Sequence, residues 1–209
     1  RYKKVTTFAK PQNLISVRFM FRDLPNVRVI EGDDIFARAY IFLNKFKIWP
    51  WRHDEIKKIG FEDLKRDPSK KFEIEFYELA GVPFEKKWES FHIERDRAAE
   101  EILLKKAGIS GQFAFVHDDK TRGYGINETL IPSGLILFRP QKGLSKNVFD
   151  YCGAIERAAE IHVIDSSFMF LIDCLEYDNP GQKLFVHRYA RANLEWSLPI
   201  LKKNWKILS

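Results

Sequence analysis

The chain has 209 residues, of which 45% are hydrophobic and 31% are charged, and these ordinary globular proportions exclude an intrinsically disordered chain. Lys and Arg number 35 against 29 Asp and Glu, for a net charge of +6. This excess suits an anionic partner, although many globular proteins carry a similar excess for solubility alone. Two cysteines, Cys152 and Cys174, are too few for a secreted disulfide scaffold. With no apolar run of about eighteen residues and no leader-like segment, we expect a cytoplasmic protein with reduced thiols.

The first part of the chain is expected to form a strand–helix–strand unit. Residues 5–9 are β-branched and apolar, residues 11–24 carry apolar side chains at helical spacing, and residues 27–30 are typical of a second strand. The connection is long enough for the two strands to pair in parallel. Residues 31–34 are predicted to be a turn, and the sequence of residues 40–71 does not favour one element over another.

The second part of the chain predicts a larger parallel sheet. A helix over residues 72–80 and a linker over residues 82–91 come first, which divides the chain into domains of residues 1–90 and 91–209. In the second domain strands alternate with helices, so the expected fold class is α/β, with two Rossmann-like domains whose parallel sheets carry helices on both faces. The expected strands are residues 113–116, 135–138, 161–164 and 184–186, and the expected helices are residues 94–107, 148–159 and 168–175, followed by a Trp-rich tail over residues 194–208.

Two loops of the second domain carry candidate binding residues, because ligands of open parallel sheets bind outside the carboxyl ends of the strands. The sequence Asp165-Ser166-Ser167 stands directly before an apolar helix, where hydroxyls and unpaired backbone N–H groups bind phosphate. In the alternative interpretation Asp165 or Ser166 is an ordinary N-cap. In the other loop, residues 117–125, Arg122 lies in a small flexible turn with Gly123 and Gly125 and could grip a diphosphate through two hydrogen bonds. Its alternative is a solvated loop arginine.

The pattern from residue 113 to residue 175 resembles the donor-binding domain of the GT-B glycosyltransferases. It is most similar to bacterial and viral enzymes of surface-polysaccharide assembly, and more distantly to heptosyltransferases and fucosyltransferases. The residues that carry this resemblance are 115–122, 150–151, 155–156 and 159–168, with a further similarity at 76–84 and 88–91. It covers roughly residues 5–40 and 72–190, and no motif within it is diagnostic alone.

The resemblance implies a metal-independent transfer of a sugar from a nucleotide-diphosphate donor to a glycan or lipid-linked saccharide. The donor diphosphate would be held by Arg122, Asp165, Ser166 and Ser167, and the nucleotide or sugar would lie near His117, Asp118, Asp119 and Glu156. It implies no metal and no cofactor other than the nucleotide-sugar substrate. It predicts no nucleic-acid partner and is compatible with a peripheral membrane contact.

The strand and Gly-rich turn that open the family pattern are not found before Val5. The acceptor-side domain of such enzymes opens with a strand and a Gly-rich turn, so we expect the first domain to be incomplete, and this chain to bind nucleotide without transferring sugar. The catalytic base is therefore unassigned. Asp33, Asp34 and His53 lie in the relevant half, but each also fits an ordinary turn or surface position.

Two rival classes of protein remain open. A metal-dependent transferase would hold a divalent cation with an Asp-x-Asp motif, which His117-Asp118-Asp119 imitates at the wrong spacing; loss of activity in a chelator would favour it. A basic nucleic-acid-binding protein would use the aromatic and basic run at residues 46–53. Against this second rival, the basic residues are scattered along the chain.

Overall fold

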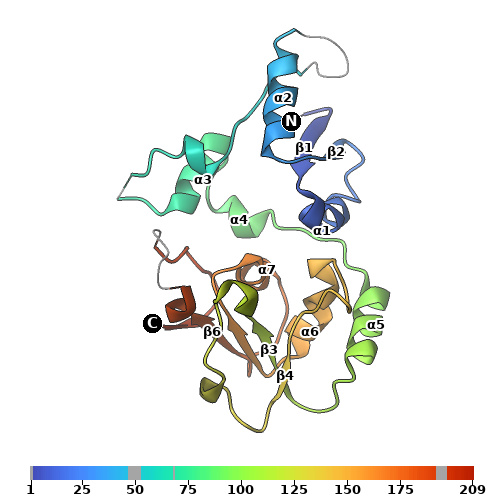
Figure 1. Cartoon of the computed structure of the whole chain (residues 1–209), viewed down its shortest axis with the longest axis vertical. Helices are drawn as coiled ribbons and strands as arrows, with labels where there is room; N and C mark the ends of the chain where they lie inside the picture. The colour runs from blue at the N-terminus through green and yellow to red at the C-terminus, as the bar shows by residue number, and fades with distance from the viewer. Residues whose placement is uncertain (1, 47–52, 68, 192–196) are drawn as a thin grey trace.

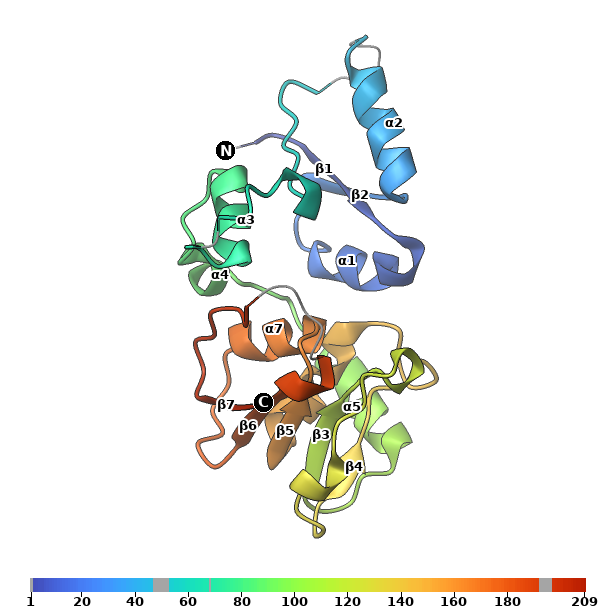
Figure 2. The same cartoon turned by 60° about the vertical axis from the view of Figure 1, so that its left-hand side comes forward.

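The computed structural model describes residues 2–46, 53–67, 69–191 and 197–209. It is an α/β structure with one parallel sheet of two strands and a second of five, and both views place the two sheets in separate halves of the molecule (Figures 1 and 2). Within the described ranges, no helix has the length and apolarity that crossing a membrane requires.

The first half contains the predicted strand–helix–strand unit. Its elements are β1 (Val5–Ala9), α1 (Leu14–Met20), β2 (Val27–Glu31) and α2 (Asp34–Asn44). The two strands pair in parallel, with Val5 opposite Val27, as predicted. The turn predicted at residues 31–34 is shorter, since β2 includes Glu31 and α2 begins at Asp34. The side chain of Asp33 accepts a hydrogen bond from the backbone N–H of Phe36 at 2.8 Å and so caps this helix.

The segment predicted to be a linker is a docked element. The helix α3 (Phe72–Ala80) ends as predicted at Gly81, whose φ of +66° favours glycine, and α4 (Lys86–Glu89) follows. The Nζ of Lys87 donates to the carbonyl of Ile200 at 2.6 Å. In Figure 1, α4 lies between the two sheets and α3 lies to the side of the first. The predicted boundary at residue 90 therefore follows a helix that is hydrogen-bonded to the C-terminal segment.

The second half is built on the five-stranded sheet. Its strands are ordered β4-β3-β5-β6-β7, and all neighbours are parallel. The elements are α5 (Arg97–Ala107), β3 (Phe113–His117), β4 (Ile136–Phe138), α6 (Cys152–Arg157), β5 (Glu160–Val163), α7 (Ser167–Cys174), β6 (Lys183–His187) and β7 (Trp205–Leu208). The predicted strands of this domain are thus confirmed as strands of one parallel sheet. The Trp-rich tail adds a strand that the sequence did not predict.

The prediction of helices on both faces of this sheet is wrong for the described residues. Phe113 and Phe115 point into the main core, to which α5, α6 and α7 all contribute, whereas Ala114 and Val116 point to the other face. That face is covered over β3 and β4 by short 3-10 turns of residues 118–135, not by an α-helix. This connection contains Gly123, Gly125, Pro132 and Gly134, and residues of these types interrupt a helix.

Both cysteines are free thiols, as expected. Cys152 is buried in α6, and burial raises the pKa of its thiol to about 12. Burial also raises the pKa of Cys174, at the end of α7, to about 11. Both groups are therefore protonated near neutral pH, which makes them poor nucleophiles.

Candidate functional site

The order of the strands places a candidate site between β3 and β5. From β3 the chain moves outward to β4, then crosses back to the other side of β3 to form β5. A reversal of this kind is a topological switch point, and ligands of such sheets bind there, outside the carboxyl ends of the strands. The strands β3 and β5 end at His117 and Val163, so the loops that begin at Asp118 and Ile164 flank the switch point.

A hydrogen bond joins the end of β3 to the loop that follows β5. The Oγ of Ser166 lies 3.0 Å from the Nδ1 of His117. Ser166 is the N-cap residue of α7 by its backbone, but its side chain makes no capping hydrogen bond. Burial lowers the pKa of His117 to about 4, so its imidazole is neutral near pH 7. Ser166 is therefore the N-cap residue by position, as the alternative interpretation had it, but its hydroxyl faces His117 and does not cap the helix.

Arginines from two further strand ends also lie at this edge. Arg139 directly follows β4, Arg188 directly follows β6, and Arg191 stands three residues later. Arg188 forms an ion pair with the carboxylate of Asp165, and the Nη1 of Arg191 donates to the backbone carbonyl of Asp165 at 2.5 Å. These arginines are not among the residues predicted from the sequence. Their positions in the sequence could have indicated them, since Arg139 and Arg188 each follow closely on a predicted strand.

Four buried atoms at this edge have no hydrogen-bond partner among the described residues. They are the Oδ2 of Asp118, the Nε of Arg139, the Oδ1 of Asp165 and the Nε of Arg191. Asp118 and Arg139 form one ion pair, with 3.6 Å between Oδ1 and Nε, and the side chain of Asp118 is only 6% exposed. A buried polar group without a partner costs about 1–3 kcal/mol, and such groups are rare in folded proteins. This edge thus contains buried hydrogen-bond acceptors and donors without a partner among the described residues.

Arg122 and Asp119 lie at the rim of this site. The side chain of Arg122 is 67% exposed and its Nη2 lies 2.5 Å from the Oδ2 of Asp119. The hydroxyl of Thr121 and the guanidinium of Arg122 hold the pKa of Asp119 below its usual value. The guanidinium carbon atoms of Arg122 and Arg191 lie 5.7 Å and 5.0 Å from the ring centre of Tyr124. This ring therefore connects the rim to the arginines at the end of β6.

The structure does not bring Glu156 together with the other predicted residues. Glu156 lies near the end of α6, just before the amino end of β5, and its carboxylate accepts hydrogen bonds from Arg95 and Arg97. Ser167, by contrast, is the first residue of α7 and borders the switch point.

The residues considered for the catalytic base lie in the first half of the chain. Asp33 caps α2, Asp34 forms an exposed ion pair with Lys10, and the Nε2 of His53 lies 3.1 Å from the hydroxyl of Tyr40. Most of the aromatic and basic run at residues 46–53 lies outside the described residues. Across the described ranges, no group of three or more His, Cys, Asp or Glu residues could hold a metal ion.

Comparison with known proteins adds no family to this description. No family model, no curated protein and no solved structure matches the chain.

Proposed function

We propose that the edge of the sheet between β3 and β5 binds a nucleotide-diphosphate sugar, and that the chain is the donor-binding part of a GT-B-type glycosyltransferase. The observation that carries the first part is the set of unpartnered atoms of Asp118, Arg139, Asp165 and Arg191 at a topological switch point. Diphosphate oxygens accept hydrogen bonds from guanidinium groups, whereas ribose and sugar hydroxyls donate to carboxylates. A nucleotide sugar offers both kinds of partner in one molecule.

The transferase part of the proposal rests on the resemblance of residues 113–175 to the donor domains of that family. The parallel α/β architecture and the second, separate sheet are compatible with a two-domain arrangement of this kind. In the proposed reaction the arginines stabilise the negative charge that grows on the departing diphosphate. This role needs no metal ion, so we expect binding of the donor to be insensitive to chelators.

The test of the site is a calorimetric titration of UDP, GDP and ADP into the chain. At least one of them should bind, and Arg139→Ala and Arg191→Ala should each weaken that binding by about 1.5–3 kcal/mol, because each loses a charge-assisted hydrogen bond. Arg122→Ala should weaken it less, since that guanidinium is exposed and lies at the rim. Arg157→Ala is the matched control. Arg157 is the last residue of α6, which precedes the amino end of β5, and its guanidinium forms an exposed ion pair with Glu101. Equal losses in Arg139→Ala and Arg157→Ala would refute the site.

Serine variants separate a binding role from a structural one. Ser166→Ala removes the hydroxyl that faces His117, and Ser167→Ala removes a hydroxyl from the first residue of α7. Both variants should weaken binding of the nucleoside diphosphate more than they lower the melting temperature. A lower melting temperature with unchanged affinity would show that the hydroxyls only support the fold.

A further inference from the structure

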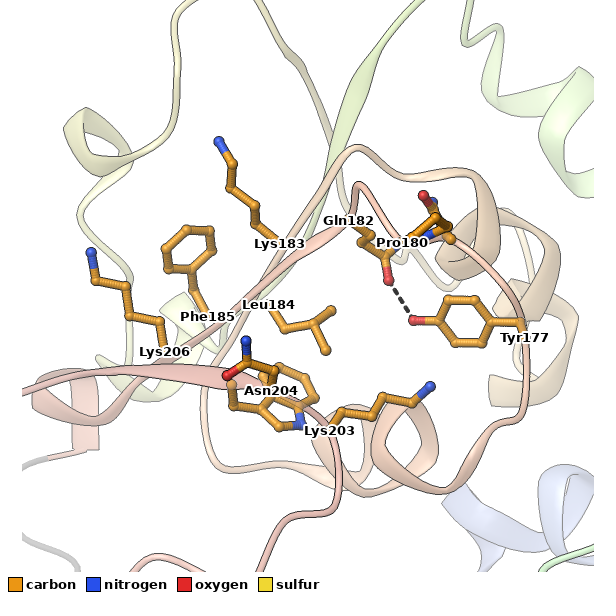
Figure 3. A pocket seen from close by; sticks show the side chains of 11 residues that line it. Tyr177, Pro180, Gln182, Lys183, Leu184, Phe185, Lys203, Asn204 and Lys206 are labelled. Carbon is orange, nitrogen blue, oxygen red and sulfur yellow. Dashed lines mark hydrogen bonds between the residues drawn. The ribbon is translucent and has the colours of Figure 1, made fainter.

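The two edges of the five-stranded sheet differ in how their polar side chains are used. A cavity of about 870 Å³ lies at the amino ends of β6 and β7. In Figure 3 the hydroxyl of Tyr177 donates to the amide oxygen of Gln182. The Nζ of Lys183 pairs with Glu160, and that of Lys203 lies 4.1 Å from the ring centre of Tyr177. These groups are engaged within the fold, whereas at the carboxyl edge four buried polar atoms have no partner among the described residues.

His117 and Ser166 form a hydrogen-bonded pair at this carboxyl edge. The Nδ1 of His117 and the Oγ of Ser166 lie 3.0 Å apart. The ring of His117 also packs against the ring of Phe168, with 4.6 Å between the ring centres, and Phe168 is buried in the first turn of α7. Packing therefore holds the imidazole in place beside the hydroxyl, in addition to the hydrogen bond.

The direction of this hydrogen bond depends on the tautomer of the imidazole. Burial lowers the pKa of His117 to about 4, although Asp118 and Asp119 act in the opposite direction, so the ring is neutral near pH 7 and carries one hydrogen. With this hydrogen on Nδ1, the imidazole donates to Ser166, and the hydroxyl hydrogen is left for another acceptor. With it on Nε2, Ser166 donates to Nδ1 and offers a ligand only oxygen lone pairs. Nε2 has no hydrogen-bond partner among the described residues, so no second contact fixes the tautomer.

A bound phosphate would favour one of the two tautomers. The phosphate groups of a nucleotide sugar accept hydrogen bonds and donate none near neutral pH. Ser166 is half-buried and directly precedes Ser167, the first residue of α7, and the N–H groups of a helix start attract anions. Because its Oγ faces His117, Ser166 makes no capping hydrogen bond with these N–H groups. The neighbouring carboxylate of Asp165 is paired with Arg188. Ser166 can donate to a phosphate here only when the Nδ1 of His117 carries the hydrogen.

We propose that His117 is a positioning residue of the donor site, whose Nδ1–H donates to Ser166 and so turns the hydroxyl hydrogen of Ser166 toward a phosphate oxygen of the ligand. This inference rests on the proposed function, since it states how one hydroxyl of that site is prepared for a diphosphate. His117 acts through Ser166 and not by its own contact with the ligand. Binding of the phosphate selects the Nδ1–H tautomer without changing the charge of the imidazole.

The experiment is nitrogen-15 NMR of the histidine side chains of the whole chain near pH 7.5, with inorganic pyrophosphate as the probe. Protonated and unprotonated ring nitrogens have well-separated shifts, so the spectrum reports the tautomer. In the complex, the Nδ1 of His117 should have the shift of a protonated nitrogen and Nε2 that of an unprotonated one. In Ser166→Ala, added pyrophosphate should no longer move these shifts. The exposed His92 is the internal reference. Hydrogen on the Nε2 of His117 in the complex would overturn the proposal.

Two variants of His117 separate positioning from support of the fold. His117→Phe keeps a ring against Phe168 and removes both nitrogens, so it should bind pyrophosphate about tenfold more weakly than the parent. His117→Asn places an amide donor near the position of Nδ1 and should recover most of this affinity. His92→Phe is the control and should bind as the parent does. Equal affinities of the Phe and Asn variants at residue 117, with equal melting temperatures, would contradict the role of the Nδ1–H.

Failure of this inference and failure of the proposed function give different results. If neither pyrophosphate nor any nucleoside diphosphate binds the parent chain, the donor site is refuted and the role of His117 with it. If pyrophosphate binds and Arg139→Ala weakens its binding, but the complex carries its hydrogen on the Nε2 of His117, the donor site stands and only the positioning role is refuted.

Discussion

Replacing Asp173 with alanine is expected to lower the free energy of unfolding by about 4 kcal/mol, because four donors would lose their common acceptor. Asp173 is buried in α7, with 2% of its surface exposed. Its carboxylate accepts hydrogen bonds from the indole nitrogens of Trp88 and Trp205 at 2.8 Å and 3.0 Å, and from the backbone N–H groups of Lys202 and Lys203 at 2.9 Å and 3.0 Å. One side chain therefore ties α4, α7 and the chain leading into β7 together.

The measurement is equilibrium unfolding in urea, with the melting temperature as a second readout. In a chain of this length a loss of about 4 kcal/mol corresponds to a fall of roughly 10 °C. Asp178→Ala is the matched control, because Asp178 is an exposed aspartate a few residues further along the chain, and such changes usually stay within about 0.5 kcal/mol. A loss below about 1 kcal/mol in Asp173→Ala would show that the four donors find other acceptors.

Acidification from pH 6.5 to pH 4 is expected to destabilise the fold through its buried histidines. Burial lowers the pKa values of His117 and His187 to about 4, and the neighbouring His162 contributes to the shift of His187. In the unfolded chain a histidine has a pKa near 6.5. Between these two values the unfolded chain binds protons that the folded chain does not, so stability falls as the pH falls. Each fully shifted histidine contributes roughly 3 kcal/mol to this loss by pH 4.

The surroundings of His187 explain why it stays neutral. Its Nε2 lies 2.9 Å from the Nδ1 of His162, and its Nδ1 lies 2.8 Å from the hydroxyl of Tyr189. The Nε2 of His162 in turn lies 3.1 Å from the carboxylate of Glu160. The carboxylate of Asp118 acts in the opposite direction to burial and raises the pKa of His187. With both imidazoles neutral, each of their ring nitrogens that donates a hydrogen bond faces an acceptor, and each that accepts one faces a donor. An added proton requires the hydrogen bonds to rearrange.

The variant His187→Gln tests this explanation by the slope of the free energy of unfolding against pH. An amide does not titrate in this range, so the free energy of unfolding of the variant should fall less steeply than that of the parent between pH 6.5 and pH 4. The comparison of slopes is independent of any loss of stability at pH 7 that the new side chain causes. Parallel curves for variant and parent would mean that His187 does not contribute to the acid sensitivity, and that carboxylates dominate it. His92→Gln is the control, because the side chain of His92 is 74% exposed.

Local sequence patterns were sufficient to predict most strands of the fold. Continuous apolar runs predicted β3 and β5, since a strand buried on both faces needs apolar side chains in both directions. The start of α7 was predicted to within one residue, because polar residues stand directly before an apolar helix. The strand β7 was missed, since Trp205 and Ile207 alternate with polar residues in a tail that carries no turn signal of its own. The helix α2 was missed because its capping aspartate also fits a turn.

By itself, the sequence determined which loops follow the strands of the larger sheet, and so it predicted His117, Asp118, Ser166 and Ser167 near one edge. Only the tertiary structure decided which strands are neighbours, because pairing depends on long-range packing and not on local pattern. That choice placed the switch point between β3 and β5 and brought Arg139, from the outer strand, to Asp118. The long-range order of the strands thus decided the candidate site between β3 and β5.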